Sequence, residues 1–125
     1  MHEETRVLAV DDDQTNLKFL KEILEDDYSL KVALTGEEAL AAIHAFNPQI
    51  VLLDVMLPGM SGYDVCKQIR GDDRLSGIKI ILISAKAMIN ERQKGYRVGA
   101  DDYITKPFDH EELLKKVQSV LSKVS

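Results

Sequence analysis

The chain of 125 residues has one cysteine, no long apolar run and too few basic residues to balance its acidic ones. The single cysteine, Cys66, excludes an internal disulfide and is typical of a reducing compartment. No apolar run approaches the roughly 20 residues of a membrane span, and the N-terminus lacks the apolar core of a signal peptide. The formal net charge of −5 argues against direct binding to nucleic acid. Together these absences predict a cytoplasmic domain that binds neither membrane nor nucleic acid.

No repeat, linker or low-complexity segment divides the chain. Hydrophobic residues make up 45% of it and charged residues 30%, a composition typical of a globular domain rather than a disordered one. The length suits a single hydrophobic core. We therefore expect one domain over residues 1–125.

Short aliphatic runs alternate with segments of helical spacing. The runs are Val7–Val10, Leu30–Leu34, Ile50–Asp54, Ile78–Ile83 and Tyr103–Thr105. After each run comes a segment whose apolar residues have the spacing of a helix. These segments extend from Thr15 to the Asp26-Asp27 pair, from Thr35 to Asn47, from Gly62 to Arg70, from Ala85 to Val98, and from Asp109 through Leu121. The fourth helical segment has only a weak apolar pattern.

Residues at the helix starts are typical of N-caps. Asp13 or Thr15 can cap the first helix. The segments Thr35-Gly-Glu-Glu38 and Asp109-His-Glu-Glu112 match capping boxes. Asn47-Pro48 ends the second helix before the central strand.

Aliphatic strands that alternate with amphipathic helices indicate a parallel sheet covered on both faces. We predict an α/β fold, a doubly wound (βα)5 flavodoxin-like three-layer sandwich. Its parallel five-stranded sheet has the order 2-1-3-4-5, a prediction that also draws on the family resemblance described below.

Polar residues stand where four of these strands end. The central strand, Ile50–Asp54, is four aliphatic residues followed by a carboxylate. A charged group at the end of a buried strand is unfavourable unless a partner compensates its charge. The first strand ends at Asp11-Asp12, the fourth at Ser84 and the fifth at Lys106. In the order 2-1-3-4-5 these strands are neighbours, so their side chains converge on one edge of the sheet.

Carboxylates within about 5 Å of one another repel by several kcal/mol at an effective dielectric of ~20. Lys106 supplies one compensating charge, and a hard divalent cation with oxygen ligands would supply two more, which favours Mg²⁺. A metal, a lysine and a hydroxyl around a carboxylate are the groups that phosphoryl transfer requires. The hypothesis is that Asp54 forms an aspartyl phosphate.

The motifs in this order closely resemble the receiver domain of two-component response regulators, over the whole chain. They are Val10-Asp11-Asp12, Leu53-Asp54 with Pro58-Gly59 and Gly62, Ser84-Ala85, and Tyr103-Ile-Thr-Lys106-Pro107-Phe108. The resemblance implies a phosphorylation-dependent signalling switch in a phosphorelay, not an enzyme acting on other molecules. It implies that a sensor histidine kinase or phosphotransfer protein donates the phosphoryl group to Asp54.

The same resemblance implies a metal site. Asp12 would bind Mg²⁺ directly and Asp11 largely through water, together with Asp54 and the backbone carbonyl of Met56. Mn²⁺ is the alternative ion. No other cofactor is expected.

The resemblance also implies a switch. Ser84 and Lys106 would contact phosphoryl oxygens, and Tyr103 would turn inward when Ser84 moves toward the phosphoryl group. Lys106-Pro107 would be a cis peptide bond. The output face that meets an unidentified downstream protein or effector domain would include Arg92, Lys94, Arg97 and Tyr103. A stand-alone receiver and a receiver within a longer regulator or hybrid kinase both fit these residues.

The enzyme alternative is a Mg²⁺-dependent phosphatase of the haloacid dehalogenase type. Asp11–Thr15 matches its opening Asp-x-Asp-x-Thr pattern, and Asp101-Asp102 resembles its late acidic pair. Lys106 follows that pair, however, whereas the phosphatase lysine precedes it, and the chain lacks residues for a substrate-covering cap. A phosphorylation-independent docking receiver is the other alternative, although no acidic or lysine position is missing.

Three further residues have simple structural interpretations. Asp13 is expected to cap a helix rather than to bind metal. Cys66 is expected in the core. Asp101-Asp102 is expected to form a polar turn before the last strand.

Overall fold

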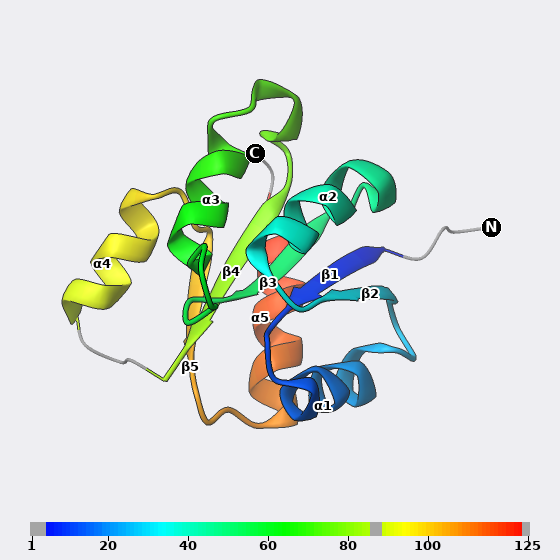
Figure 1. Ribbon diagram of the computed structural model, residues 1–125. Helices are drawn as coiled ribbons and strands as arrows, with labels where there is room; N and C mark the ends of the chain where they lie inside the picture. The colour runs from blue at the N-terminus through cyan, green and yellow to red at the C-terminus, as the bar shows by residue number, and fades with distance from the viewer. Residues whose placement is uncertain (1–4, 86–88, 124–125) are drawn as a thin grey trace.

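The structure is a computed structural model that describes residues 5–85 and 89–123 (Figure 1). In this part of the chain five strands alternate with five α-helices, and a 3-10 helix lies between α3 and β4. The elements are β1 (Arg6–Val10), α1 (Gln14–Leu24), β2 (Ser29–Ala33), α2 (Gly36–Phe46), β3 (Ile50–Asp54), α3 (Gly62–Arg70), η1 (Asp73–Leu75), β4 (Lys79–Ser84), α4 (Ile89–Arg97), β5 (Asp102–Thr105) and α5 (His110–Ser122).

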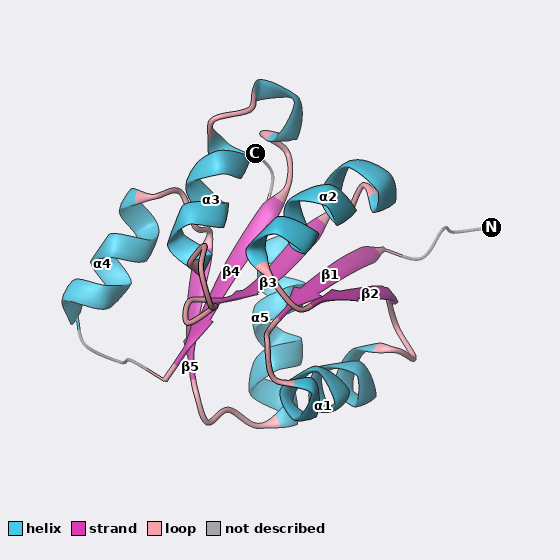
Figure 2. Cartoon of the chain, viewed as in Figure 1, coloured by secondary structure: helices cyan, strands magenta, loops and turns pink. Residues whose placement is uncertain are grey.

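All strand pairs are parallel, in the order β2-β1-β3-β4-β5, which confirms the predicted topology. Helices α1 and α5 cover one face, and α2, α3 and α4 cover the other (Figure 2). Successive β3 residues alternate between the two cores: Ile50 and Leu52 face α1 and α5, whereas Val51 and Leu53 face α2 and α3. Residues 50–53 of the central strand are all aliphatic because both faces of the strand are buried. Among the described residues, no helix combines the length and apolar character needed to cross a membrane.

The strand register brings the predicted polar residues to one edge of the sheet. Val10 of β1 is opposite Leu53 of β3, and Asp54 is opposite Ile83 of β4. Beyond the last pair of β4 and β5, the amide of Lys106 donates to the carbonyl of Ser84 at 2.8 Å. Strands β1, β3, β4 and β5 therefore end at the same level of the sheet, as the sequence predicts.

The helix starts follow the capping residues closely. Asp13 accepts the amide of Thr15 at 2.8 Å, so Asp13 is the cap of α1 and the alternative, Thr15, is not. Thr35 and Asp109 accept the amides of Glu38 and Glu112 at the third helical position. Ser61 and Asp64 form a complete capping box at the start of α3, which was not predicted from the sequence.

The predicted start of the fourth helix was wrong. The fourth helix was predicted from Ala85, but Ala85 lies in a bend, residues 86–88 lie outside the described residues, and the described helix begins at Ile89. Its side chains are mainly polar, so no apolar stripe marks its start. Its end agrees with the prediction, since Gly99 adopts a φ of +106° two residues after Arg97.

Asp101 and Asp102 do not form a simple polar turn. Asp102 is the first residue of β5 and pairs with Lys116 of α5 at 3.1 Å. The Asp101 carboxylate accepts the amide of Ile80 at 2.7 Å and the guanidinium of Arg70 at 2.8 Å. Together with the carbonyls of Gly99 and Ile78, which Arg70 also binds, these groups form what we call the Arg70 clamp.

Gly62 begins α3 directly against the backbone of β3. Its amide donates to the carbonyl of Val55 at 3.0 Å. A Cβ atom at Gly62 would lie 2.8 Å from the Cα of Val55 and would also collide with the carbonyl of Asp54. Because both obstacles are backbone atoms, they cannot move aside without distorting the end of β3.

We therefore expect Gly62→Ala to lower the free energy of unfolding by about 1–3 kcal/mol, the usual range for overpacking. Urea denaturation measures this change. Gly77→Ala is the matched control, since a Cβ there would meet nothing within 4 Å. Equal stability of the two variants would contradict the close approach of α3 to β3.

Candidate functional site

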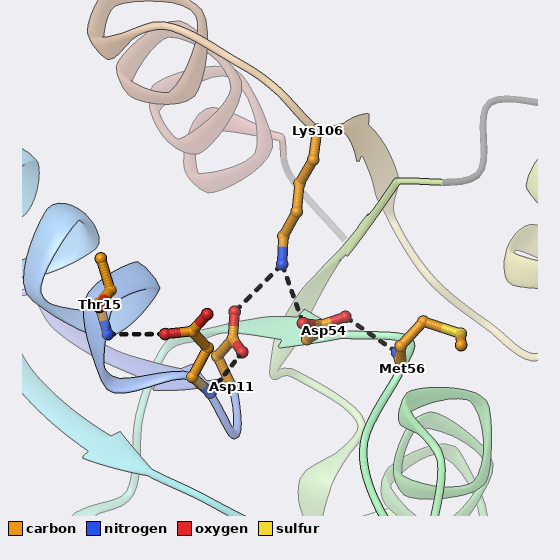
Figure 3. Close-up of polar contacts among 6 residues, drawn as sticks. Asp11, Thr15, Asp54, Met56 and Lys106 are labelled. Atoms are coloured by element: carbon orange, nitrogen blue, oxygen red, sulfur yellow. Dashed lines mark hydrogen bonds and ion pairs between the residues drawn. The ribbon is translucent and has the colours of Figure 1, made fainter.

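Asp54 is a buried carboxylate with defined partners on both oxygens. It ends β3, and only 5% of its surface is exposed. Its Oδ1 accepts the amide of Met56 at 2.9 Å, and its Oδ2 accepts the Lys106 ammonium at 2.9 Å (Figure 3). The backbone of the following loop and the lysine directly after β5 thus fix the orientation of the carboxylate.

Lys106 bridges two acidic side chains that stand at the ends of different strands, Asp54 ending β3 and Asp11 directly following β1. Besides Asp54, its Nζ donates to Oδ2 of Asp11 at 3.2 Å (Figure 3). Asp11 is 3% exposed, and its Oδ1 accepts the amide of Asp13. The Lys106-Pro107 peptide bond is cis, as the family resemblance implies. One ammonium group therefore faces two buried carboxylates.

Asp11, Asp12 and Asp54 form the acidic cluster. Each contributes an oxygen, and these atoms all lie within 4.8 Å of one another. Asp12 is exposed, whereas the other two are buried. Three hard oxygen donors with a single lysine beside them suit a divalent cation such as Mg²⁺, which takes carboxylate ligands and keeps several waters.

Burial and charge act against each other at this site. Burial raises the pKa of Asp54, and the Asp11 charge adds to that rise, which the hydrogen bonds from Lys106 and Met56 only partly offset. Burial lowers the pKa of Lys106, but its hydrogen bond to Asp54 and the charges of Asp54 and Asp11 outweigh this effect, so the net shift is upward. The acidic cluster is thus short of positive charge, and Lys106 stays protonated.

Ser84 and Tyr103 lie on β4 and β5, the strands beyond β3 in the sheet. Ser84 ends β4, is fully buried, and accepts the Lys106 amide with its carbonyl. Tyr103, near the middle of β5, is 1% exposed. Arg92 lies over its ring at 5.7 Å from the centroid and also donates to Thr105.

The expected output face needs one correction. Arg92, Lys94 and Arg97 are exposed on α4, as predicted, but Tyr103 is buried beneath that helix rather than part of its surface. The reason is Gly95, the one buried residue of α4 among residues 90–97. Its lack of a side chain lets α4 approach the Tyr103 ring.

An apolar cavity beside the site was not apparent from the sequence. It has a volume of about 390 Å³ and opens next to Asp54 and Lys106, with Phe19, Leu20 and Phe108 in its wall. The rings of Phe19 and Phe108 are 5.9 Å apart between centroids. Phe19 lies outside the apolar stripe of α1, so the helical pattern gives no signal for it.

The chain matches known proteins over nearly its whole length. The family model for the response regulator receiver domain covers residues 7–118. Response regulator MprA of Mycolicibacterium vanbaalenii is 40% identical over 123 residues, which are 96% of this chain and 52% of MprA. DNA-binding response regulator MtrA of Mycobacterium tuberculosis is 41% identical over 117 residues, or 93% of this chain and 50% of MtrA. The chain thus spans about half the length of these curated relatives.

Solved structures agree with the fold. Chemotaxis protein CheY4 of Vibrio cholerae superposes with a TM-score of 0.90 at 31% identity, covering 94% of this chain and 99% of CheY4. The beryllofluoride-activated receiver domain of DrrB, from a Thermotoga maritima homologue of OmpR and PhoB, gives a TM-score of 0.86 at 37% identity. That match covers 97% of this chain and 100% of the DrrB domain.

The double contact of Lys106 predicts a clear stability effect. Without metal, Lys106→Met should lower the free energy of unfolding at pH 7 by about 1–3 kcal/mol, because it leaves two buried carboxylates uncompensated. In an Asp54→Asn background the same change should have a smaller effect, since one of the two charges is already gone. Denaturation of the four proteins in a double-mutant cycle measures this difference. An equal effect of Lys106→Met in both backgrounds would contradict the bridge.

Proposed function

The chain belongs to the response regulator receiver domain family, and on this premise we propose that Asp54 accepts a phosphoryl group from a phosphohistidine of a sensor histidine kinase or phosphotransfer protein. Receivers of this family are signalling switches of two-component systems, and residues 1–125 act here as one such domain. The main support is that Lys106 holds Asp54 and Asp11 together at the carboxyl edge of the sheet.

In the transfer, an oxygen of Asp54 attacks phosphorus while the bond between phosphorus and the donor imidazole nitrogen breaks. The leaving nitrogen keeps the electron pair of that bond. Lys106 lies within hydrogen-bond distance of the Asp54 carboxylate, so its ammonium stays beside the charge that shifts onto the phosphoryl oxygens. The receiver thereby catalyses only its own phosphorylation and, with water as the nucleophile, its dephosphorylation.

Asp11, Asp12, Asp54 and the backbone carbonyl of Met56 are the proposed ligands of Mg²⁺, with Mn²⁺ as the alternative. The fit rests on the donor set, three carboxylate oxygens within 4.8 Å of one another. When bound, the ion supplies charge neutralisation for the phosphoryl group. Asp11 keeps its contact with Lys106 as a second link between the acidic cluster and β5.

The proposed switch uses Ser84 and Tyr103. The Ser84 hydroxyl and the Lys106 ammonium contact phosphoryl oxygens, which favours the conformation with Tyr103 buried. Phosphorylation then shifts an existing equilibrium rather than creating a new fold. The exposed face formed by α4, β5 and α5 changes its affinity for a downstream partner. Tyr103 is buried in this structure, which is the conformation that the proposal assigns to the phosphorylated state.

The partner is proposed to be a protein or effector domain rather than DNA itself. The relative MtrA is a DNA-binding response regulator, and this chain matches only half of it. The acidic charge of −5 makes the receiver itself a poor ligand for phosphate backbones. The proposal also includes a cytoplasmic location for this protein and a kinase partner that acts on it in the cytoplasm.

The phosphatase alternative is disfavoured by the position of Asp101. This residue precedes β5 and pairs with Arg70 and the amide of Ile80 near the start of β4. Asp54 and Lys106 lie at the opposite edge of the sheet, at the end of β3 and directly after β5. Asp101 therefore cannot serve as a late acidic ligand in the same site.

Mg²⁺-dependent labelling by acetyl phosphate tests the phosphoacceptor. We expect the chain to take up one acid-stable, base-labile phosphoryl group and Asp54→Asn to take up none, because the nucleophilic oxygen is lost. Phosphate-affinity electrophoresis or intact-mass measurement detects the label. Undiminished labelling of Asp54→Asn, with loss of label in Asp11→Asn, would instead favour the phosphatase chemistry.

Metal binding should be visible as stabilisation. Mg²⁺ at ten times its Kd should add about 1.4 kcal/mol, or roughly 4–6 °C in Tm. Asp12→Ala should lose this response, since Asp12 is an exposed ligand whose removal leaves the core intact. Asp13→Ala is the control: it removes a helix cap, lowering stability by about 1 kcal/mol, but should keep the response to Mg²⁺. Loss of the response in both variants, or in neither, would contradict the ligand assignment.

A further inference from the structure

Helix α4 has little apolar anchoring. Of its residues 90–97, only Gly95 is buried, and the others are exposed or half-buried. A helix usually gains its stability in a protein by burying an apolar face. For this part of α4 that contribution is small, so its position depends on close backbone approach and on polar contacts.

Two tyrosines from other elements lie beneath α4. A Cβ at Gly95 would be 3.2 Å from the ring of Tyr103 and 2.8 Å from Leu82, which shows how closely the helix approaches β4 and β5. Arg92 lies over the Tyr103 ring, and Lys94 lies over the ring of Tyr63 at 4.6 Å from the centroid. Cations over aromatic rings contribute about 0.5–1 kcal/mol each when exposed.

Tyr63 has a more specific contact through its hydroxyl. It is the second residue of α3 and is 6% exposed. Its hydroxyl donates to Oε2 of Glu91 at 2.9 Å and approaches the carbonyl of Glu91 at 3.3 Å. Burial raises the pKa of Tyr63, and so do its hydrogen bond to Glu91 and its interaction with Tyr103, so the hydroxyl remains a donor.

Tyr63 is also close to the proposed phosphorylation site through the backbone. The preceding residue, Gly62, donates to the carbonyl of Val55 and lies against the backbone of Asp54. The first turn of α3 therefore connects the end of β3 to the first turns of α4. In this connection the Tyr63 hydroxyl hydrogen-bonds to Glu91 of α4.

We propose that the Tyr63 hydroxyl is a positioning group that holds α4 against α3 through Glu91 and thereby keeps Tyr103 in its buried position. The contact itself is independent of phosphorylation. Its regulatory meaning, that Tyr63 favours the phosphorylated conformation, rests on the function proposed above. Removing the hydroxyl should free α4 and shift Tyr103 away from the buried state.

Tyr63→Phe tests the contact, because it keeps the ring and the Lys94 stacking and removes only the donor. A hydrogen bond to a charged acceptor typically contributes enough to change an opening equilibrium by tenfold or more. We expect the amides of α4 to exchange with deuterium about tenfold faster in Tyr63→Phe, with unchanged protection in α2. Tyr28→Phe is the matched control, since Tyr28 lies in the connection between α1 and β2, and it should leave α4 exchange within about twofold.

A double-mutant cycle with Glu91→Ala shows whether the contact is direct. Glu91→Ala should accelerate α4 exchange similarly, and adding Tyr63→Phe should change it by less than about threefold. The proposal would be overturned if the two substitutions acted independently, so that their effects on the exchange rate multiplied. It would also be overturned if the α4 amides exchanged at the same rate in Tyr63→Phe and in Tyr28→Phe.

The link to Tyr103 has its own measurement. With ¹³C-labelled tyrosine rings, Tyr63→Phe should shift the Tyr103 signals in the unphosphorylated chain and weaken Mg²⁺-dependent beryllofluoride binding by up to about tenfold. Unmoved Tyr103 signals with unchanged beryllofluoride affinity would overturn the positioning role.

Acetyl phosphate labelling of Asp54 in the same variants separates the two proposals. An unlabelled wild-type chain contradicts the proposed function alone, whereas normal labelling with unchanged α4 exchange contradicts the role of Tyr63 alone.

Discussion

The ion pairs of Lys106 with Asp54 and Asp11 are the interaction on which the rest of the site depends. Two carboxylates that are almost fully buried would repel each other strongly, and their charges would be poorly solvated. Lys106 compensates them only in part, since the pKa of Asp54 is still raised. A divalent cation can supply the positive charge that is still missing, so the unfavourable electrostatics of the resting site and its proposed binding of metal have the same origin.

The sheet makes this arrangement possible by keeping polar groups out of its interior. Residues 50–53 are buried and aliphatic, and they alternate between two separate cores. In β1, β3, β4 and β5 charged residues lie only at the strand ends, and the parallel register places Asp11, Asp54 and Lys106 at one level. Gly62 then lets α3 begin immediately on the backbone of β3. The same packing that stabilises the sheet thus limits how far the Asp54 carboxylate can move.

The fold and the convergence of charged strand ends could be predicted because each depends on local patterns: aliphatic runs, helical spacing and the residue that follows each run. Contacts between distant side chains could not. Tyr63 sits on an inward helix position and its partner Glu91 is 28 residues away, so nothing in the spacing distinguishes it from an ordinary core aromatic. Asp101 looked like a turn residue because its partner, Arg70, is 31 residues distant. The start of α4 was misplaced because the described helix has no apolar stripe to define it.

The Arg70 clamp gives α4 two unequal ends. Just beyond its C-terminus, the carbonyl of Gly99 accepts from Arg70, and the carbonyl of Val98 accepts from the thiol of the buried Cys66 at 3.4 Å. At the opposite end, the contacts of the described residues are those of the Tyr63 hydroxyl with the side chain and carbonyl of Glu91, and the side-chain contacts of Arg92 and Lys94. A nine-residue helix is about 13 Å long. A tilt of α4 by roughly 10° about Gly99 would therefore displace its N-terminal end by about 2 Å.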